Sequence, residues 1–434
     1  MKHILFIAVS IVVTASASAQ AADPLSESPK PIPTTRPEIK TALEALKDRQ
    51  PRLPLPAAPQ GEASVNNGRM RTLYLPESWV SGGSRSQKPG QSFRGRWQDP
   101  NSKLDYGLTR ACFWVVSRGN NCHYCLGHQE LALRHAGFDD DEIAAIDIDW
   151  SGFDPRQQAS LAFARKLTLE PHLVDDADIA ALKKQFTDAE IIELAYNIAR
   201  FNATNRWTDG LGIPQDRRMA EAENSFVTPT SEKFLNTVSI VSPTTRAARS
   251  LPEMRELEQE IEDCHRRQPR VALPSDEDAR KALAGVIGER SPTNWERALS
   301  QLPVTGPTQV AALNAIMTDE HLAPRLKAEI FLISAIHNRA WYGAGHAAHR
   351  LHAGGVSHDE LVAMFQGDAG ATPGEAAAHR LATKSTIDPH LVTDADIAAV
   401  REHYSDAETA QIVQVICMAN LFDRFTESLG LPLE

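Results

Sequence analysis

Apolar residues recur every three to four positions along most of the chain, and alternation of apolar and polar residues never lasts more than a few positions. A spacing of three to four residues places apolar side chains on one side of an α-helix, whereas a half-buried strand needs alternating apolar and polar residues. In the first half of the chain, the pattern predicts helices near residues 107–118, 122–136, 140–146, 155–168, 176–185 and 188–209. The sequence therefore predicts an all-α fold.

Residues that begin and end helices support these boundaries. Thr187 and Glu190 have the spacing of a capping box at the start of the last of these helices, and Ser405 and Glu408 repeat the spacing later in the chain. Gly137 follows an earlier periodic run, in the position where glycine commonly ends a helix.

Three stretches of the first half return 218 residues later, which indicates an internal duplication. The pairs are RQPRLPLP at 49–56 with RQPRVALP at 267–274, PHLVDDADIAA at 171–181 with PHLVTDADIAA at 389–399, and RWTDGLGIP at 206–214 with RFTESLGLP at 424–432. The constant spacing predicts two copies of one helical unit. We expect the copies to pack on each other as a pseudo-dimer, because a lone copy would expose an apolar face.

The repeats define the expected domains. We place the first repeat at 61–214, a linker at 215–250 and the second repeat at 251–434. Residues 20–60 form a proline-rich, extended N-terminal segment, which the weak helical pattern EIKTALEALKD interrupts.

The N-terminus has the pattern of a secretory signal peptide covering residues 1–19. Lys2 and His3 precede the apolar run ILFIAVSIVV, and Ala17 and Ala19 suit cleavage before Gln20. The run is too short to span a bilayer, and no later stretch approaches a membrane span. We expect a periplasmic or secreted protein with no membrane partner.

Composition narrows the classes of partner. The formal charge of −11 over 434 residues argues against nucleic acid or an anionic membrane as a main partner. The Gly-, Ser- and Arg-rich stretch GGSRSQKPGQSFRGRW at 82–97 predicts a mobile loop, with capture of an anionic ligand as the alternative.

The candidate chemistry lies in GNNCHYCLGHQE at 119–130, which holds two of the five cysteines, Cys122 and Cys125, with His128 three residues further on. With Asn120 or Asn121 as the cap, the C-x-x-C opens a helix, where backbone donors and the helix dipole favour a thiolate. The other cysteines do not suggest chemistry, and those at 112 and 417 lie in apolar helical runs.

Successive members of this cluster are about 60° apart around a helix, so Cys125 lies between its two partners. A histidine can accept the proton of a neighbouring thiol, and a second thiol can capture a sulfenic acid as a disulfide. This geometry favours Cys125 as the attacking thiol, whereas the dipole alone favours Cys122. The assignment stays open at this point.

The cysteine pair could also serve structure, metal binding or haem attachment. An exported protein could hold it as a permanent structural disulfide. A zinc site needs four ligands as a rule, and the chain has no second C-x-x-C, so no metal is expected. Attachment of c-type haem needs histidine directly after Cys125, where Leu126 stands, and no other cofactor is expected.

The stretches NNCHYCLGHQELAL, LTRACFWVVSRG and NATNRWTDGLGIP resemble the alkylhydroperoxidase D-like or carboxymuconolactone decarboxylase family. The resemblance covers roughly 107–214 and, more faintly, 325–432. It implies two tandem helical repeats of this family's kind, association into homo-oligomers, and peroxidase activity. In that activity Cys125 attacks a hydroperoxide and Cys122 resolves the product, with an unidentified thiol as reductant.

The chain departs from the family at three positions. Arg110 stands where better-studied members have glutamate, and Tyr124 and Gln129 stand where they have histidine. His128 can substitute for the histidine expected at position 129, because both positions point to one side of the helix, and Tyr124 can donate a proton.

The second repeat has no thiols at the equivalent positions, which are Ala340 and Gly343. Tyr342 and His346 remain, and we expect His346 to be structural. The sequence thus predicts an exported thiol peroxidase with one active copy. The alternatives are a non-catalytic binding or scaffold protein with a structural disulfide, and a lactone decarboxylase-like enzyme.

Overall fold

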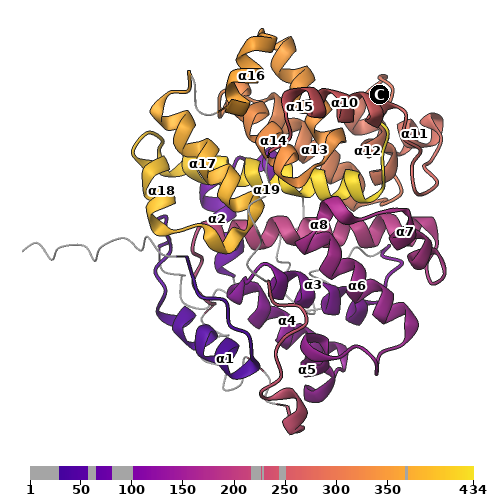
Figure 1. The fold of residues 1–434 in the computed structure, drawn as a ribbon, viewed down its shortest axis with the longest axis vertical. Helices are drawn as coiled ribbons and strands as arrows, with labels where there is room; N and C mark the ends of the chain where they lie inside the picture. The colour runs from indigo at the N-terminus through magenta and orange to yellow at the C-terminus, as the bar shows by residue number, and fades with distance from the viewer. Residues whose placement is uncertain are drawn as a thin grey trace, which may run out of the picture.

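The regular structure of the chain is helical throughout the part described by the computed structural model, which comprises residues 29–56, 65–80, 101–216, 226, 229–243, 251–366 and 370–434. This confirms the predicted all-α fold (Figure 1). The predicted signal peptide and the loop at 82–97 lie outside the described residues.

The helices predicted for the first half are present, with ends within two residues of those expected. They are α3 (Tyr106–Gly119), α4 (His123–Ala136), α5 (Asp140–Ile148), α6 (Pro155–Leu169), α7 (Asp176–Lys183) and α8 (Asp188–Gly210). Two helices precede them, α1 (Arg36–Ala45) and α2 (Asn66–Tyr74). The weak pattern within the proline-rich segment therefore forms a helix, α1, which the 3-10 turn η1 (Leu46–Asp48) extends.

The second half repeats this order with additions. Its helices are α10 (Met254–His265), α11 (Asp276–Ile287), α12 (Asn294–Leu299), α13 (Thr305–Thr318), α14 (Pro324–Asn338), α15 (Trp341–Ala353), α16 (His358–Gln366), α17 (Pro373–Ile387), α18 (Asp394–Arg401) and α19 (Asp406–Ser428). The bounds of α5, α7 and α8 recur 218 residues later in α16, α18 and α19.

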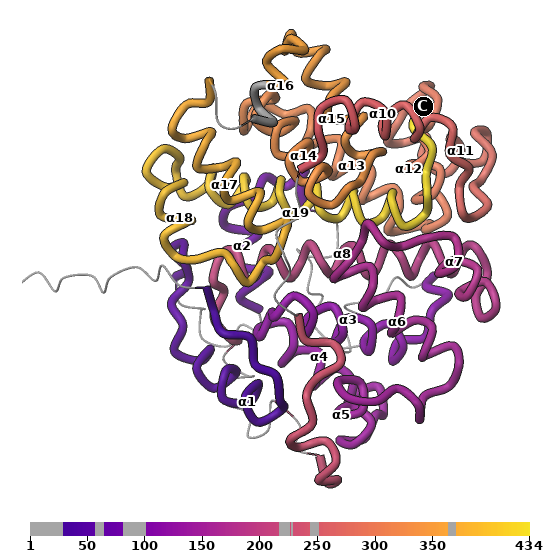
Figure 2. The backbone as a smooth tube through the Cα atoms, viewed as in Figure 1, coloured from indigo at the N-terminus to yellow at the C-terminus, as the bar shows by residue number. Residues whose placement is uncertain are grey.

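The long helices α8 and α19 lie side by side through the centre of the molecule (Figures 1 and 2). Helices α3, α4 and α6 pack around α8, and α14, α15 and α17 pack around α19. One continuous hydrophobic core contains residues from both halves. Burial of this shared core is the main favourable term that holds the halves together.

The predicted capping boxes begin these two central helices. The Thr187 hydroxyl accepts the Glu190 N–H at the start of α8, and Ser405 and Glu408 do the same for α19. Gly137 ends α4 with a φ of 98°, in the left-handed region that glycine adopts without strain.

The predicted cap of the cysteine helix was wrong. Asn121 has a φ of 54° and closes α3, because the Asn121 N–H bonds Arg118 O and the Cys122 N–H bonds Ser117 O. A residue in this left-handed conformation cannot also be the extended N-cap of the next helix, and Asn120 is the C-cap of α3. The N-cap of α4 is therefore Cys122 itself.

The segment containing α2 and η2 (Glu77–Trp79) reaches the other half of the chain. Trp79 Nε1 donates to Asp319, and η2 packs on α13. Arg71 Nη1 donates to Gln414 Oε1 of α19 over 3.0 Å. The first half therefore contributes elements to the surroundings of the second.

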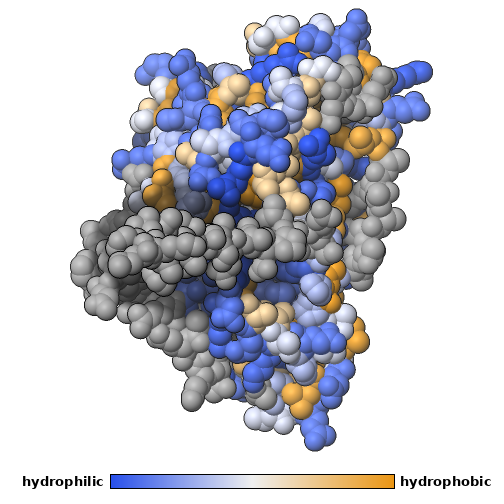
Figure 3. Space-filling view, turned by 90° about the vertical axis from the view of Figure 1, so that its left-hand side faces the viewer, coloured by the Kyte–Doolittle hydropathy of each residue, from blue (hydrophilic) through white to orange (hydrophobic). Residues whose placement is uncertain are grey.

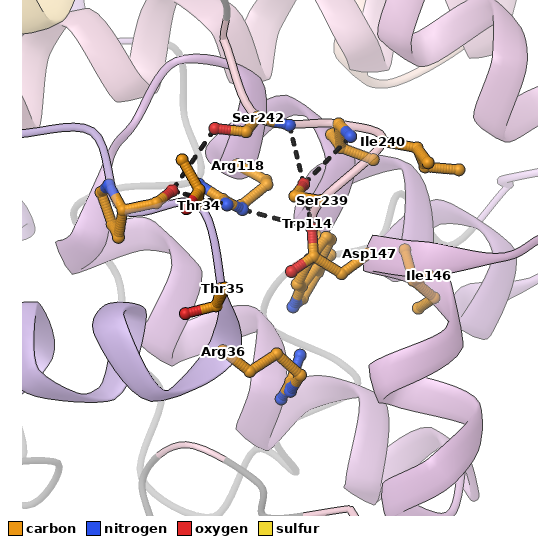
Figure 4. Close-up of polar contacts among 12 residues, drawn as sticks. Thr34, Thr35, Arg36, Trp114, Arg118, Ile146, Asp147, Ser239, Ile240 and Ser242 are labelled. Carbon is orange, nitrogen blue, oxygen red and sulfur yellow. Dashed lines mark hydrogen bonds and ion pairs between the residues drawn. The ribbon is translucent and has the colours of Figure 1, made fainter. Parts of the chain in front are cut away.

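The N-terminal segment and the described part of the expected linker meet on α3 and α5 (Figure 4). Arg118 and Asp147 form a buried ion pair with 3.2 Å between Nε and Oδ1, and Arg118 also donates to Pro33 O. Ser239 donates to the same Asp147 carboxylate, while the Ile240 N–H bonds the Asp147 carbonyl. The buried pair thus fixes both segments to the first half.

Hydrophobic residues on the face in Figure 3 are scattered among hydrophilic ones. The large apolar side chains that are exposed within the described ranges are spread over several segments, such as Leu73 on α2, Leu173 on η4 (Pro171–Leu173), and Val238 and Ile240 in the segment after η5 (Glu232–Phe234). None of the helices in those ranges combines the length and apolar character needed to cross a membrane.

Candidate thiol site

The turn between α3 and α4 brings the two cysteines of the C-x-x-C together. Asn120 fixes this turn to α8, because its amide donates to Asn202 Oδ1 over 2.9 Å and to Asn205 Oδ1 over 3.1 Å. Cys122 then caps α4 and Cys125 lies on its first turn. The sequence predicts both residues at the start of this helix, and the structure places them there.

Both sulfur atoms contact one hydroxyl group on α8. Cys122 Sγ lies 3.1 Å and Cys125 Sγ 3.2 Å from Thr208 Oγ1. The hydroxyl has backbone carbonyls as its own acceptors, Thr204 O at 3.2 Å and Asn205 O at 3.1 Å. The single Thr208 hydroxyl proton can go to one of these carbonyls or to one of the sulfur atoms, and the hydroxyl oxygen can accept from either thiol.

The two thiols are buried and are not joined by a disulfide, with 0% of Cys122 and 3% of Cys125 exposed. Burial raises the pKa of Cys125 well above its ordinary value, and the hydrogen bond with Cys122 acts in the same direction. The hydrogen bond with Thr208 opposes this shift. Cys125 is thus a protonated thiol in this arrangement.

Beside the thiols, Tyr124 and His128 share the carboxylate of Asp216. The Tyr124 hydroxyl donates to Asp216 over 3.1 Å, and His128 Nε2 lies 2.8 Å from Asp216 Oδ2. From α2, the Asn66 N–H donates to Asp216 Oδ1 over 2.7 Å, and the Asn67 N–H donates to the Tyr124 hydroxyl over 3.4 Å. Three separate segments therefore converge on this cluster.

The histidine of the cluster faces an acceptor with each ring nitrogen. His128 Nδ1 lies 2.8 Å from the Tyr124 carbonyl, and Nε2 faces Asp216. Burial alone would lower the pKa of His128, but the hydrogen bond and charge of Asp216, with the Tyr124 carbonyl, outweigh burial and raise it. The arrangement favours an imidazolium paired with an aspartate, and Asp216, rather than a thiol, is the hydrogen-bond partner of His128 Nε2.

The second half builds the same cluster without thiols. The Tyr342 hydroxyl donates to Glu434 over 2.9 Å, and His346 Nε2 lies 3.1 Å from Glu434. Gly343 stands in place of Cys125, and a Cβ at this position would collide with Asp423 Oδ1. The tyrosine, histidine and carboxylate therefore assemble whether or not cysteines are present.

The other residues singled out in the sequence do not contact the sulfur atoms through the hydrogen bonds described. Arg110 lies on α3, with its guanidinium 4.6 Å from the centroid of the Tyr106 ring, and Gln129 is buried on α4. Cys112 and Cys417 are buried, and burial raises the pKa of each to about 12. This burial agrees with the expectation that both are inert.

Sequence reasoning missed Thr208 and Asp216. Thr426 occupies the equivalent of Thr208 in the second repeat, so the comparison of repeats did not associate a threonine with the thiols. Asp216 was assigned to the linker, although the 218-residue spacing relates it to the acidic Glu434. Applied to the end of the second repeat, that spacing would have found it.

Within the described ranges, no three His, Cys, Asp or Glu side chains are grouped so that they could hold a metal ion. No protein-family model matches the chain, and a search of curated proteins finds none similar to it. Membership of the alkylhydroperoxidase D-like family therefore remains a prediction based on the residues quoted above.

Proposed function

We propose that the protein is an exported thiol peroxidase of the alkylhydroperoxidase D-like kind, in which Cys125 attacks a hydroperoxide and Cys122 resolves the product. The observation that carries this proposal is the convergence of both sulfur atoms on the Thr208 hydroxyl. Two thiols that share one partner at the start of a helix are close enough to exchange a disulfide for a dithiol.

The proposed reaction transfers two electrons from the thiols to the peroxide. The Cys125 thiolate attacks the terminal peroxide oxygen, the O–O bond breaks, and the leaving alkoxide takes a proton to become an alcohol. The resulting Cys125 sulfenic acid then reacts with the Cys122 thiol, forming the disulfide and releasing water. An external dithiol restores both thiols by exchange, and becomes a disulfide itself.

Thr208 supports formation of the thiolate in this scheme. Its hydroxyl can rotate away from the carbonyls of Thr204 and Asn205 and donate to the Cys125 sulfur once that sulfur loses its proton. A hydrogen bond to the charged form lowers a thiol pKa, which opposes the effect of burial on Cys125. We therefore assign the activation of Cys125 in part to Thr208.

Tyr124 and His128 have a different role in the proposal from the one their sequence positions suggested. Because Asp216 engages both side chains, we assign them to holding α4, α2 and residue 216 together around the thiols. The occurrence of the same cluster without thiols at Tyr342 and His346 favours this positioning role. Tyr124 remains the candidate proton donor to the leaving alkoxide.

We further propose that the two repeats form a pseudo-dimer. Reciprocal contacts at the 218-residue spacing support this arrangement. Arg52 Nε donates to Asp394 Oδ1 at the start of α18 over 2.6 Å, and Arg270 Nε donates to Asp176 Oδ1 at the start of α7 over 2.7 Å. Matched pairs of this kind are expected at a two-fold, self-complementary interface.

The assignment of the thiols is tested with single serine variants. Peroxide treatment of Cys122→Ser should leave a sulfenic acid at Cys125 that a dimedone probe captures, whereas Cys125→Ser should consume no peroxide. The buried Cys112→Ser is the matched control and should keep wild-type turnover. A sulfenic acid trapped at Cys122, or equal residual turnover in both site variants, would overturn the assignment.

Burial of both thiols, which limits the access of a hydroperoxide, also favours a second candidate function, a scaffold in which the pair closes as a fixed disulfide. Thiol titration separates the two. A pair that cycles between dithiol and disulfide with mild reductant supports the peroxidase, and a pair that resists mild reductant supports the scaffold.

A further inference from the structure

Two arginine side chains near the thiol site rest on aromatic rings. The Arg71 guanidinium, from α2, lies 4.6 Å from the centroid of the Trp207 ring. The Arg200 guanidinium, from α8, lies 5.6 Å from the Phe113 ring centroid and 6.0 Å from that of Tyr196. Cation–π contacts of this kind hold a guanidinium while leaving its N–H groups available to an anion.

Neither arginine has a carboxylate partner in the part of the chain that the structure describes. Arg71 donates only to amide oxygens, Asn67 Oδ1 over 3.3 Å and Gln414 Oε1 over 3.0 Å. The contact of Arg200 is with Asn197 Oδ1 over 3.5 Å, and its buried Nε has no hydrogen-bond partner in the described ranges. A part-buried cation without a counter-charge is costly unless a ligand supplies one.

Arg71 lies close to the residues that surround Cys125. Trp207, on which Arg71 rests, directly precedes Thr208, and Asn67 joins the Arg71 side chain to the Tyr124 hydroxyl. Burial lowers the pKa of Arg71 to about 10, with Cys417 and Cys125 raising it and Arg200 lowering it further. Both Cys125 and Arg200 are therefore within electrostatic reach of Arg71.

The second repeat supplies an internal comparison, because it keeps the fold without the thiols. The 218-residue spacing puts Met418 in place of Arg200. In α12, Asn294 makes the contacts of Asn66, with its N–H on Glu434, so Leu299 corresponds to Arg71. Both replacements are buried hydrophobic residues.

Arginines with a structural role behave differently in this comparison. Arg69 Nη1 donates to Asn66 Oδ1 over 3.1 Å, and Arg297, its counterpart on α12, donates to Asn294 Oδ1 over 3.0 Å. Arg69 and Arg297 are thus present with the same contact in both halves. Arg71 and Arg200 are present only in the half with thiols, which associates them with the chemistry of that half rather than with folding.

We propose that Arg71 and Arg200 form an anion-binding site beside Cys125, and that the substrate is an organic hydroperoxide carrying a carboxylate. The substrate class rests on the proposed peroxidase function. The guanidinium groups bind the carboxylate, and the buried rings of Trp207 and Phe113 hold the two guanidinium groups in place. The binding energy holds the peroxide group near the Cys125 sulfur.

The test compares a fatty-acid hydroperoxide with its methyl ester, which has the same chain and no charge. The wild-type protein should have a KM for the acid about 10- to 100-fold below that for the ester, the range expected for a charge-assisted pair. Arg200→Gln should raise the KM for the acid by that factor and leave the ester unchanged. Arg200→Lys, which keeps the charge, should retain the preference, and Arg255→Gln, on the exposed face of α10, is the charge control.

Equal slowing of both substrates by Arg200→Gln would overturn the proposal, as would equal KM values in the wild-type protein.

A second measurement distinguishes a failure of the proposed anion site from a failure of the proposed peroxidase function. Linoleate, which has no peroxide group, should quench tryptophan fluorescence on binding to the wild-type protein, and Arg200→Gln should weaken this binding about tenfold or more. Binding of this kind without peroxide consumption would refute the peroxidase and keep the anion site; no binding would refute the anion site.

Discussion

The ion pair between His128 and Asp216 should make the stability of the protein depend on pH in a defined direction. The pKa of His128 is raised in the folded state, so its contribution to stability is complete below the unfolded value of about 6.5. The contribution is lost as pH rises through the folded pKa. Stability supplied by this pair therefore falls as pH rises above the unfolded pKa of His128.

The perturbation is Asp216→Asn, which removes the charge and keeps the shape. The carboxylate accepts from His128, Tyr124 and the Asn66 N–H, and the remaining amide oxygen can keep only part of this set. Hydrogen bonds to charged groups contribute about 1.5–3 kcal/mol each. We expect a loss of about 2–3 kcal/mol in the free energy of unfolding at pH 6, and about 1 kcal/mol once His128 is neutral.

The assay is urea unfolding at several pH values of the wild-type protein, Asp216→Asn, His128→Gln and the double variant. These four proteins form a double-mutant cycle, whose coupling energy measures the interaction between His128 and Asp216 apart from the other contacts of each residue. It should be about 1.5–2 kcal/mol at pH 6 and should decline as pH rises. A coupling energy that does not change with pH, or that grows, would refute the assignment of a charged His128.

Two further predictions concern the thiols and the repeats. Thr208→Val should slow formation of the Cys125 sulfenic acid about tenfold, because one hydrogen bond to the thiolate is lost. Thr426→Val in the second half is the control and should leave the rate unchanged. Stopped-flow measurement of peroxide consumption gives both rates. Residues 20–228 expressed alone should expose the face of α8 that packs on α19, and should associate or bind a hydrophobic dye. A stable monomer without dye binding would contradict the pseudo-dimer.

Helix positions could be predicted from the sequence because local signals determine them. The apolar spacing and the capping residues Thr187 and Ser405 act within a few positions of each other, and the structure has α8 and α19 where these signals place them. The N-cap of α4 was misjudged for an equally local reason. Asparagine suits both an N-cap and a left-handed closing residue, and the sequence does not distinguish these uses at Asn121.

The candidate site could be predicted only where its residues are neighbours in sequence. Cys122 and Cys125 were found from their spacing. Thr208 and Asp216 come from distant segments and reach the cysteine helix only through the packing of α8 and of the chain after it. Arg71 was missed for the same reason. It lies on α2, which is distant in sequence from the cysteines and is positioned by its packing on α19. Apart from the 218-residue spacing that relates Asp216 to Glu434, these long-range contacts leave no pattern in a single sequence.

The contact between α8 and α19 has a consequence for how the protein behaves at low concentration. Two separate subunits that bury such a face come apart on dilution, since their association depends on protein concentration. Here both helices belong to one chain, so each meets the other at an effective concentration fixed by the connecting residues. The thermal midpoint should therefore stay constant on dilution, and α8, which carries Thr208 of the thiol site, stays packed on α19 where the protein is scarce.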